Sequence, residues 1–584
     1  MSARETYLAA RVLNALLRED YGGLGRRVTR DKVGVELVLA SGRIVRLSPG
    51  SLYQDFVVGA DESLTLNEVL ATLWAVADPA DEAGVLAFAE ECREALASLR
   101  LHDEHSPGVL AALRDDPRES LIARETVAAF VDHPVYPTAR ARTGLGAGEL
   151  VAYAPEFAPR FALRWAAVPR ERVRQAGGAD TLGVEAADVG LPPYISGTHA
   201  LFPVHPLTVP ALAEIPGVVV APEARALVRP TLSMRTVELS PRTHLKLPLT
   251  TSTLGLRNRR SIKPGTLADG AAAERMLREV LAAEPGLAVS LGDEQTYAHA
   301  GHEYLGWLLR RLPEGEIVPV ASLLAPSPRG GTVLAEVAAS RACGDEAALV
   351  EGYLRLLMRW NVTLFVKYGV ALEAHQQNLS LVYGDGPPRL LVKDNDGLLA
   401  SPARLRMAGI TVPSFTDERM LTDDPHALAD VFVTITLHLA AAAIAFHALP
   451  HARASALVRG TLTEALDEHG DDPMARLLRA RTLDAARLIG KSMVTAGTLV
   501  DKARSGARDV NKFYGTSGPN YLRRPRGGAH MDRCGPFALV PLHERRERQE
   551  PAPEGRHTPA RGPGHGPGHG QGHGQGHGVS GRVS

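Results

Sequence analysis

Acidic, amide and imidazole side chains gather in two nearby segments, EAHQQN at residues 373–378 and KDNDG at residues 393–397. The runs LSLVY and RLLVK, separated by GDGPP, lie between them and predict a β-hairpin that brings the two segments together. Mg²⁺ prefers carboxylate and amide oxygens, so this is a candidate magnesium site. His375 is a candidate ligand, acid, base or cation facing a phosphate, whereas a histidine beside Gln and Asn is more often a hydrogen-bonding core residue.

Cations and hydroxyl groups are interleaved between residues 229 and 265. The alternation in HLKLPL predicts a strand that carries His244 and Lys246 on one face. Such groups on strands suit a polyphosphate where no glycine-rich loop is present, so we interpret the segment as an anion site. The alternative is a basic sheet face in contact with water. The polar members are Thr231, Ser233, Arg235, Thr236, Lys246, Thr250, Thr251, Ser252, Thr253, Arg257, Arg259, Arg260 and Lys263.

A third segment, DHPVYP at residues 132–137, contains two X-Pro pairs that hold the backbone extended. This rigid loop would direct His133, Arg140 and Arg142. Arginine is suited to planar, bidentate recognition of carboxylates, so the loop is a candidate acid-binding segment. The alternative is a structural turn whose arginines lie in water.

Common nucleotide and catalytic motifs are absent from the sequence. Gly490-Lys491-Ser492 resembles the end of a phosphate-binding loop, but Ala485 stands where that loop needs glycine, and the segment AARLIGKS has a helical pattern. We therefore reject it. Gly144, Gly146 and Gly148 do not complete GxGxxG, because Glu149 stands where the last glycine is needed. HExxH, GxSxG and a kinase catalytic loop are missing, so any ATP site here is of an uncommon kind.

The chain divides into three stretches that differ in composition and in the spacing of apolar residues, and these stretches predict the elements that position the groups above. Residues 1 to about 130 have apolar residues at helical spacing. From about 150, short strands joined by turns are predicted, among them ELVAYAPEF and IPGVVVAP. Helices are predicted again from about 340 to 503. Residues 431–449 carry no formal charge and have the length of a membrane span, but the stretch is alanine-rich and contains Thr and His. We interpret it as a buried helix of a soluble protein.

Composition excludes several classes of protein. The formal net charge of −1 argues against a nucleic-acid-binding protein. Three scattered cysteines cannot form a disulfide framework, which favours a reducing compartment, the cytoplasm. The charged N-terminus is unlike a signal peptide. The end of the chain, residues 526–584, is rich in Gly, Pro and His and is expected to be a disordered tail; the alternative is a metal-scavenging tail.

Taken together, these segments resemble the NRPS-independent siderophore synthetases, the IucA/IucC-like family that includes aerobactin synthetase. The resemblance spans roughly residues 130 to 400. The sequence departs from the family pattern where Tyr136 replaces a histidine, Leu207 a tryptophan and Lys393 an arginine. The segments that carry the resemblance are His133–Gly144, Pro203–Pro206, Ser233–Thr236, His244 with Lys246, residues 251–257, Glu373–Asn378 and Lys393–Gly397.

The resemblance implies an α+β fold with a cupped-hand, three-part architecture. A helical thumb would span residues 1–150, strand-rich fingers 151–395 and a mainly helical palm 396–525, followed by the tail. The implied reaction is adenylation of a carboxylate, most commonly citrate, by ATP with Mg²⁺. An amine or hydroxyl group would then attack to give an amide or ester. The implied partners are a polycarboxylate, an amine or amino-alcohol and a second copy of the chain in a homodimer, without nucleic acid or membrane.

The resemblance also assigns roles to individual residues. Either Arg257 or Arg259, together with His375, would face the charge that develops at the α-phosphate. The implied ATP-binding residues are Ser233, Arg235, Thr236, Lys246, Gln377 and Asn378. The implied magnesium ligands are Glu373, Asn378 and Asp394. The residues that would bind the carboxylates of the acid are His133, Arg140 and Arg142.

Two other functions remain open on the sequence. One is a different ATP-dependent ligase that activates the acid as an acyl phosphate, which would release phosphate instead of pyrophosphate. The other is a non-catalytic family member that binds a siderophore or metal, with the histidine-rich tail as its metal port.

Overall fold

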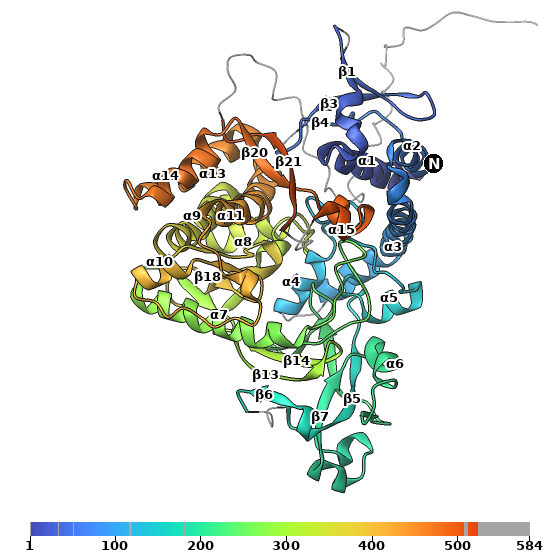
Figure 1. Cartoon of the computed structure of the whole chain (residues 1–584), viewed down its shortest axis with the longest axis vertical. Helices are drawn as coiled ribbons and strands as arrows, with labels where there is room; N and C mark the ends of the chain where they lie inside the picture. Colours follow the sequence, from blue (N-terminus) through green and yellow to red (C-terminus); the bar gives the residue numbers. More distant parts are fainter. Residues whose placement is uncertain are drawn as a thin grey trace, which may run out of the picture. The chain divides into compact units, whose positions relative to one another are not determined.

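The computed structural model describes residues 2–32, 34–50, 52–115, 120–178, 182–506 and 512–523. They lie in one compact unit, Met1–Leu539; the second unit, Val540–Ser584, and the predicted tail at 526–584 lie outside the described residues. Helices and sheets both contribute to the described part (Figure 1), which confirms the mixed α+β class. The three-part cupped-hand division stays a prediction.

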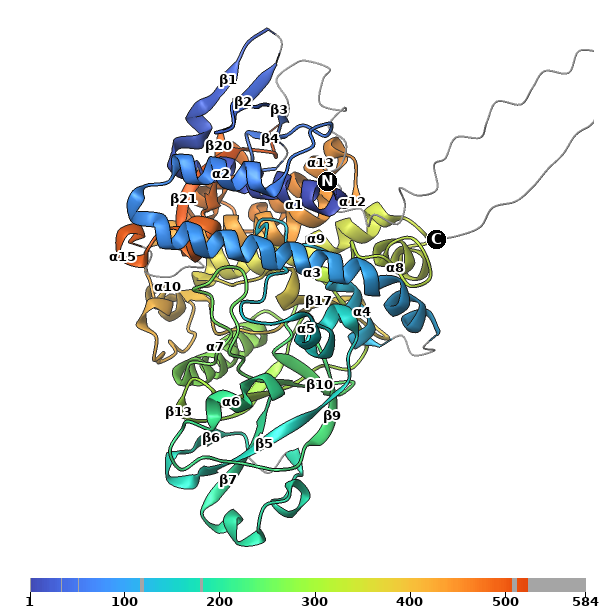
Figure 2. The same ribbon diagram turned by 90° about the vertical axis from the view of Figure 1, so that its right-hand side faces the viewer.

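Three helices and a small sheet form the N-terminal part. The helices are α1 (Ala3–Arg18), α2 (Leu66–Val76) and the long α3 (Glu82–Asp115), which Figure 2 shows lying next to α1 and α2. The prediction that residues 1 to about 130 are helical is wrong between residues 28 and 58, where β1 (Val28–Arg30), β2 (Val35–Val38), β3 (Ile44–Pro49) and β4 (Phe56–Val58) form an antiparallel sheet. The alternating burial of β3 fits a strand.

The strand-rich region is built on a nine-stranded sheet in the order β6-β13-β14-β11-β10-β9-β5-β7, with β8 paired to β5. The predicted strand HLKLPL is β11 from Thr243 to Lys246. The segment ELVAYAPEF, predicted as a strand, instead contains helix α5 (Ala147–Tyr153). The other strands are β5 (Phe161–Pro169), β6 (Arg174–Ala176), β7 (His199–Val204), β8 (Val219–Val220), β9 (Arg225–Pro230), β10 (Thr236–Ser240), β13 (Asp293–His302) and β14 (Leu305–Arg311).

A second sheet, in the order β12-β18-β17-β15, contains the predicted hairpin. Strand β17 (Leu379–Tyr383) pairs antiparallel with β18 (Arg389–Val392), so this prediction is confirmed. The outer strands are β12 (Val289–Leu291) and β15 (Glu316–Pro319). The hairpin places the segments before β17 and after β18 at the same end of the sheet.

Buried helices complete the described unit, chiefly α9 (Glu346–Thr363), α11 (Pro425–Val431), the π-helix η13 (Phe432–Ala442), α12 (Ala443–Ala448) and α13 (His451–Asp467). One continuous helical stretch in the described residues, Pro425–Ala448, is long and apolar enough to cross a membrane, but 89% of its apolar window is buried inside the protein. It serves as a core helix, which confirms that this segment is a buried helix.

The helical prediction for residues 474 to 503 is wrong in its second half. After α14 (Pro473–Arg479) and the short π-helix η14 (Ala480–Asp484), the chain forms β20 (Arg487–Lys491), which pairs with β21 (Tyr514–Pro519). Another short π-helix, η15 (Thr495–Leu499), follows β20. The segment GKS therefore ends a strand and does not lie inside a helix.

Candidate active site

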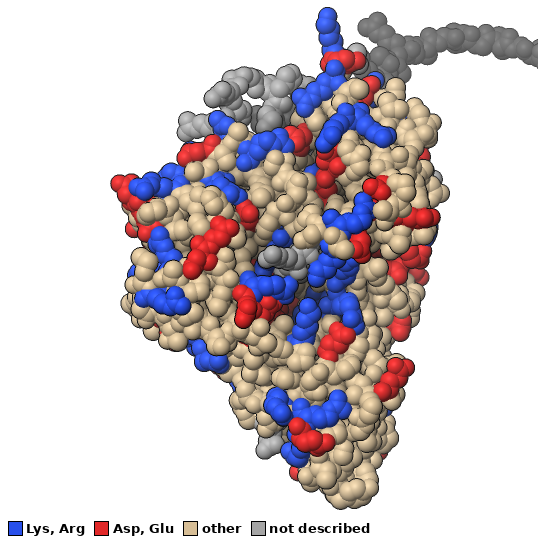
Figure 3. All heavy atoms as spheres, viewed as in Figure 1, with Lys and Arg blue, Asp and Glu red and all other residues tan. Residues whose placement is uncertain are grey.

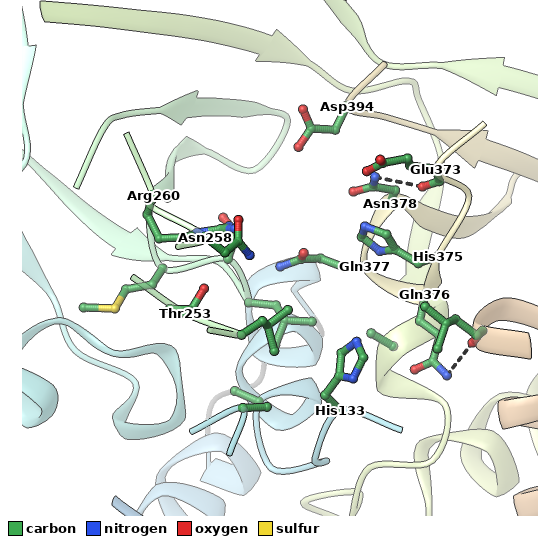
Figure 4. Close-up of a pocket in the computed structure, with 18 of the residues that line it drawn as sticks. His133, Thr253, Asn258, Arg260, Glu373, His375, Gln376, Gln377, Asn378 and Asp394 are labelled. Carbon is green, nitrogen blue, oxygen red and sulfur yellow. Dashed lines mark hydrogen bonds between the residues drawn. The ribbon is translucent and has the colours of Figure 1, made fainter. Parts of the chain in front are cut away.

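One cavity of about 390 Å³ brings the three sequence segments together. Figure 4 shows Arg260 and Asn258 on one side, the 373–378 turn on the other, and His133 and Asp394 at separate ends. On the face shown in Figure 3, Lys and Arg side chains gather around a central hollow, beside a smaller group of acidic side chains. The predicted residues among those that line the cavity are His133, Arg140, Arg142, Ser233, Arg235, Arg259, Glu373, His375, Gln377, Asn378 and Asp394.

The 373–378 turn is fixed by its own hydrogen bonds. Asn378 donates from Nδ2 to the carbonyl of Glu373 at 3.0 Å, and Gln376 donates from Nε2 to the carbonyl of Leu439 at 2.8 Å (Figure 4). The side chains of His375 and Gln377 point into the open space of the cavity (Figure 4), and Glu373 also lines it. Burial and the positive charge of Lys491 lower the pKa of His375 to about 4, so its ring is neutral near pH 7.

The acidic wall follows strand β18. Asp394 has a left-handed backbone (φ 66°), and its Oδ1 accepts a hydrogen bond from the Lys246 ammonium at 2.5 Å. Lys246 also contacts Asp396 at 3.2 Å and is itself buried. Burial opposes ionisation of Asp394, but Lys246 and Arg310 together hold its pKa well below the usual range. Because Lys246 serves two carboxylates and does not line the cavity, it positions the acidic wall from behind.

Magnesium would have oxygen ligands on this wall. Glu373, Asp394 and Asp396 all line the cavity. In the part of the chain that the structure describes, no group of three or more His, Cys, Asp or Glu residues is placed closely enough to hold a metal ion by itself. Magnesium commonly binds through one or two carboxylates plus substrate phosphates and waters, so these residues fit an ion that arrives with ATP.

The opposite wall carries positive charge from a tight turn and from a hairpin formed by residues 249–260. In the turn before β10, Ser233 Oγ accepts from the Thr236 amide at 3.1 Å, and Arg235 Nη1 donates to the carbonyl of Ser261 at 2.8 Å. Thr236 itself is buried outside the cavity lining. Arg260 lies next to Arg235, and its Nε has no hydrogen-bond partner among the described residues. Burial and the charge of Arg235 lower the pKa of Arg260 to about 9.

The two arginines proposed from sequence for the catalytic role are both engaged elsewhere. Arg257 donates from Nη1 to the carbonyl of Ala496 at 3.1 Å and does not line the cavity. Arg259 lines the cavity, but its guanidinium contacts Glu303 at 2.7 Å and the Tyr304 hydroxyl at 2.8 Å. The geometry favours Arg260, because its cation faces the cavity without an ion pair among the described residues.

The HPVYP loop places His133 at the cavity and fixes its tautomer. His133 Nδ1 accepts from the amides of Val135 at 3.1 Å and Tyr136 at 2.9 Å, so the neutral ring carries its proton on Nε2. Burial, followed by the nearby His375 and the charges of Arg11 and Lys491, lowers the pKa of His133 to about 3. Its ring is neutral at pH 7 and offers one donor.

Arg140 and Arg142 line the same cavity, but acidic partners already neutralise them. Arg140 donates from Nε to Asp132 at 2.6 Å. Arg142 makes two parallel hydrogen bonds to the buried Glu156, at 2.7 and 2.9 Å. Such paired guanidiniums hold the loop together more than they attract a further anion.

Sequence reasoning missed several residues of the site. Arg260 was included only as one member of the basic run, and Lys491 was dismissed with the phosphate-loop motif. A signal for Asp396 was present, since it lies two residues after Asp394 on the same acidic segment. The cavity residues without an assigned role in the sequence analysis include Thr253, Asn258, Arg260, Asp396, Lys491 and Met493.

Two family models match separate segments of the chain. Residues 120–325 match the model of the IucA / IucC family. This part of the chain is therefore similar to the IucA / IucC family. Residues 347–503 match a second model, described as ferric iron reductase FhuF-like transporter.

Of the following two curated relatives, one is named for siderophore biosynthesis. The chain is 28% identical over 357 residues to the uncharacterized protein y4xN of Sinorhizobium fredii, which is 51% of this chain and 55% of the relative. It is 25% identical over 343 residues to the rhizobactin siderophore biosynthesis protein RhbC of Rhizobium meliloti, which is 50% of this chain and 56% of the relative. The matches thus span about half the length of these relatives.

Solved structures share the fold over most of the chain. The petrobactin biosynthesis protein AsbB of Bacillus anthracis matches with a TM-score of 0.68 at 17% identity, covering 89% of this chain and 96% of that chain. ATP-bound aerobactin synthetase IucA of Klebsiella pneumoniae matches with a TM-score of 0.64 at 19% identity, covering 88% and 99%. The segments matched by the two family models therefore lie within one IucA / IucC-type fold, which confirms the resemblance inferred from the sequence.

Proposed function

We propose that this chain is an ATP-dependent siderophore synthetase that adenylates a carboxylate, most commonly that of citrate, and condenses it with an amine or hydroxyl group. AMP and pyrophosphate would be released. The observation that carries the proposal is the cavity itself, which has two arginines on one wall, three carboxylates on another and a neutral histidine facing the same space. ATP, Mg²⁺, citrate, the homodimer and the cytoplasmic location are parts of this proposal.

The reaction joins two anions, so neutralisation and positioning are its main requirements. Arg235 and Arg260 would contact the phosphate oxygens, and the hydroxyl of Ser233 lies in the same lining. Magnesium held at Glu373, Asp394 and Asp396 would supply further neutralisation of the phosphates. His375, being neutral, would donate a hydrogen bond toward the α-phosphate without adding repulsion among the cations.

The nucleophile is proposed from the relatives. A Staphylococcus aureus relative, 23% identical over 316 residues, is named as 2-[(L-alanin-3-ylcarbamoyl)methyl]-3-(2-aminoethylcarbamoyl)-2-hydroxypropanoate synthase. That product name contains carbamoyl groups on a hydroxy acid, which are amides of carboxylates with amines. It supports an amine as the second substrate of this chain.

The test is a product assay that crosses polycarboxylic acids with diamines, hydroxylated diamines and amino acids. The proposal predicts acid-dependent formation of AMP and pyrophosphate in equal amounts. ADP and phosphate would instead indicate an acyl-phosphate ligase. Turnover in no combination, together with iron-siderophore binding that needs no ATP, would indicate a non-catalytic member.

A further inference from the structure

Lys491, in the rejected GKS motif, lies at the end of β20 and lines the cavity. The pairing of β20 with β21 is interrupted there, since Gly490 pairs with Thr516 whereas Lys491 pairs with Tyr514. Gly515 is thus the extra residue of a β-bulge. A bulge breaks the regular alternation of a strand and redirects a side chain, and bulges are frequent next to active sites.

Two glycines make this bulge possible. A Cβ on Gly490 would lie 2.8 Å from Thr516 Oγ1, and a Cβ on Gly515 would lie 2.9 Å from Ser492 Oγ. Both distances are too short for ordinary contact between these atoms. A side chain at either position would therefore require the Thr516 or Ser492 hydroxyl to move.

The chain that follows Lys491 is fastened by two buried carboxylates of the N-terminal helices. Glu19 accepts from the amides of Val494 at 3.0 Å and Thr495 at 2.8 Å. Glu91 accepts from the Thr498 hydroxyl at 2.9 Å. With β21 on one side and these anchors on the other, the backbone of Lys491 is held rigidly beside the cavity.

The positive charges of the cavity fall into two groups. Arg235 and Arg260 lie together, and the negative charges of Asp394 and Asp396 act on Arg260 to raise its pKa against the effect of burial. Lys491 acts on the other end, because its charge lowers the pKa of both His133 and His375. The charges of Arg260 and Asp394 also act on the pKa of His375, so His375 lies between the two groups of cations. This is the arrangement that two different anions meeting at His375 would need.

We propose that Lys491, together with the Nε2–H of His133, binds a carboxylate of the acid substrate. This inference rests on the proposed function and gives the acid a site at the end of the cavity away from the acidic wall. A lysine ammonium offers three donors and a compact charge, and His133 supplies a fixed donor beside it. Arg140 and Arg142 then serve to hold the loop that carries His133.

The experiment compares Lys491→Ala and Lys491→Arg with Arg487→Ala, which removes a cation from the same strand whose guanidinium binds Asp55 instead. Affinities for citrate and for ATP are measured separately by calorimetry, and KM values for each by AMP release. Loss of a charge-assisted pair is expected to weaken citrate binding by about ten- to hundred-fold. ATP affinity should change less than about two-fold, Lys491→Arg should recover part of the loss, and Arg487→Ala should match the wild type.

The binding measurements and the AMP-release measurements together separate this inference from the proposed function. Loss of ATP affinity in Lys491→Ala would show that Lys491 binds phosphate, and unchanged affinity for both ligands would show that it binds neither; each overturns the inference. The inference also fails if the wild type binds none of the polycarboxylates tested. If citrate binding depends on Lys491 but no AMP forms with any nucleophile, the inference holds and the proposed function fails.

Discussion

Arg260 is the residue whose role the structure changes most. It lies beside Arg235 at the cavity, whereas Arg259 is exposed and paired with Glu303. We predict that Arg260→Ala lowers kcat for AMP formation by about a hundred- to a thousand-fold, by analogy with removal of one donor from a preorganised anion site. Arg259→Ala is the matched comparison and should retain most activity. Equal losses in both variants, or a larger loss at Arg259, would return the catalytic role to Arg259.

Arg142 is expected to act on stability more than on substrate binding. Its bidentate pair with Glu156 is buried, so Arg142→Ala leaves an uncompensated carboxylate and should cost about 3 to 5 kcal/mol in the free energy of unfolding. Replacing both partners by leucine should recover much of that loss. Urea unfolding of the single and double variants checks this. A single variant with wild-type stability and a strongly raised KM for the acid would restore the substrate role inferred from sequence.

For single residues, the sequence indicated which residue types belong to the site but not which side chains they pair with. The three segments were recognised because polar and charged residues cluster within each, and eleven of the residues assigned to them line one cavity. The sequence could not show that Glu156 and Asp132 already neutralise Arg142 and Arg140, since each partner is chosen by local folding of the loop. It also could not separate Arg257, Arg259 and Arg260, because their directions depend on the hairpin.

At the scale of elements, the hairpin that carries Arg260 depends on its contact with the short π-helix η15. Gly255 has a φ of 111°, and a Cβ there would lie 2.9 Å from the Cα of Gly497. We predict that Gly255→Ala displaces the hairpin and lowers the rate of AMP formation by about ten- to hundred-fold, as small misplacements of catalytic groups do. Crystal structures and kinetics of the variant would measure both effects.

Gly148 provides the control for that substitution. It lies in helix α5, and a Cβ there meets no atom within 4 Å. Gly148→Ala should keep full activity and gain up to about 1 kcal/mol of stability from its higher helix propensity. If Gly255→Ala behaves like Gly148→Ala, the hairpin is not positioned by η15.

The prediction of helices and strands succeeded where the apolar residues followed one clear spacing, and it failed for short strands. The 379–392 hairpin was predicted because two apolar runs flank a Gly-Pro turn. Strand β20 was missed because its apolar residues continue the helical spacing of α14, and its partner β21 lies beyond a long intervening segment. The β1–β4 sheet was missed for a related reason, since each strand is only three to six residues long.

At the scale of the whole molecule, buried histidines make stability depend on pH. Burial lowers the pKa of His133 and His205 to about 3 and of His375 and His438 to about 4. A histidine with a lowered folded pKa stabilises the protein fully above the unfolded value of 6.5, and this contribution is lost as the pH falls toward the folded value. We therefore predict that the thermal midpoint falls steadily as the pH is lowered from 6.5 to about 4.

His205→Asn tests the origin of that slope. His205 accepts the Leu207 amide through Nδ1 and packs against Tyr153 and Phe161 away from the cavity lining. An asparagine oxygen can replace the Nδ1 acceptor without titrating. The variant should show a shallower fall of the midpoint with pH than the wild type, and an unchanged slope would mean that carboxylates dominate acid unfolding.

The histidine-rich end of the chain should not affect catalysis. The described residues that line the cavity lie between 128 and 493, and the Gly- and Pro-rich composition of 526–584 is unsuited to a packed site. A protein truncated after residue 530 is expected to show wild-type kcat and KM for AMP formation. Normal folding with much lower turnover would contradict this and favour a metal-delivery role for the tail.

The central claim is that the cavity activates an acid as its adenylate, and exchange of labelled pyrophosphate into ATP measures that step directly. With ATP, Mg²⁺ and citrate or a related polycarboxylate, and without any amine, the wild type should incorporate label into ATP. Exchange should require the acid and fall about a hundred-fold or more in Arg260→Ala. Acid-dependent release of phosphate without pyrophosphate exchange would show an acyl-phosphate route and contradict the account.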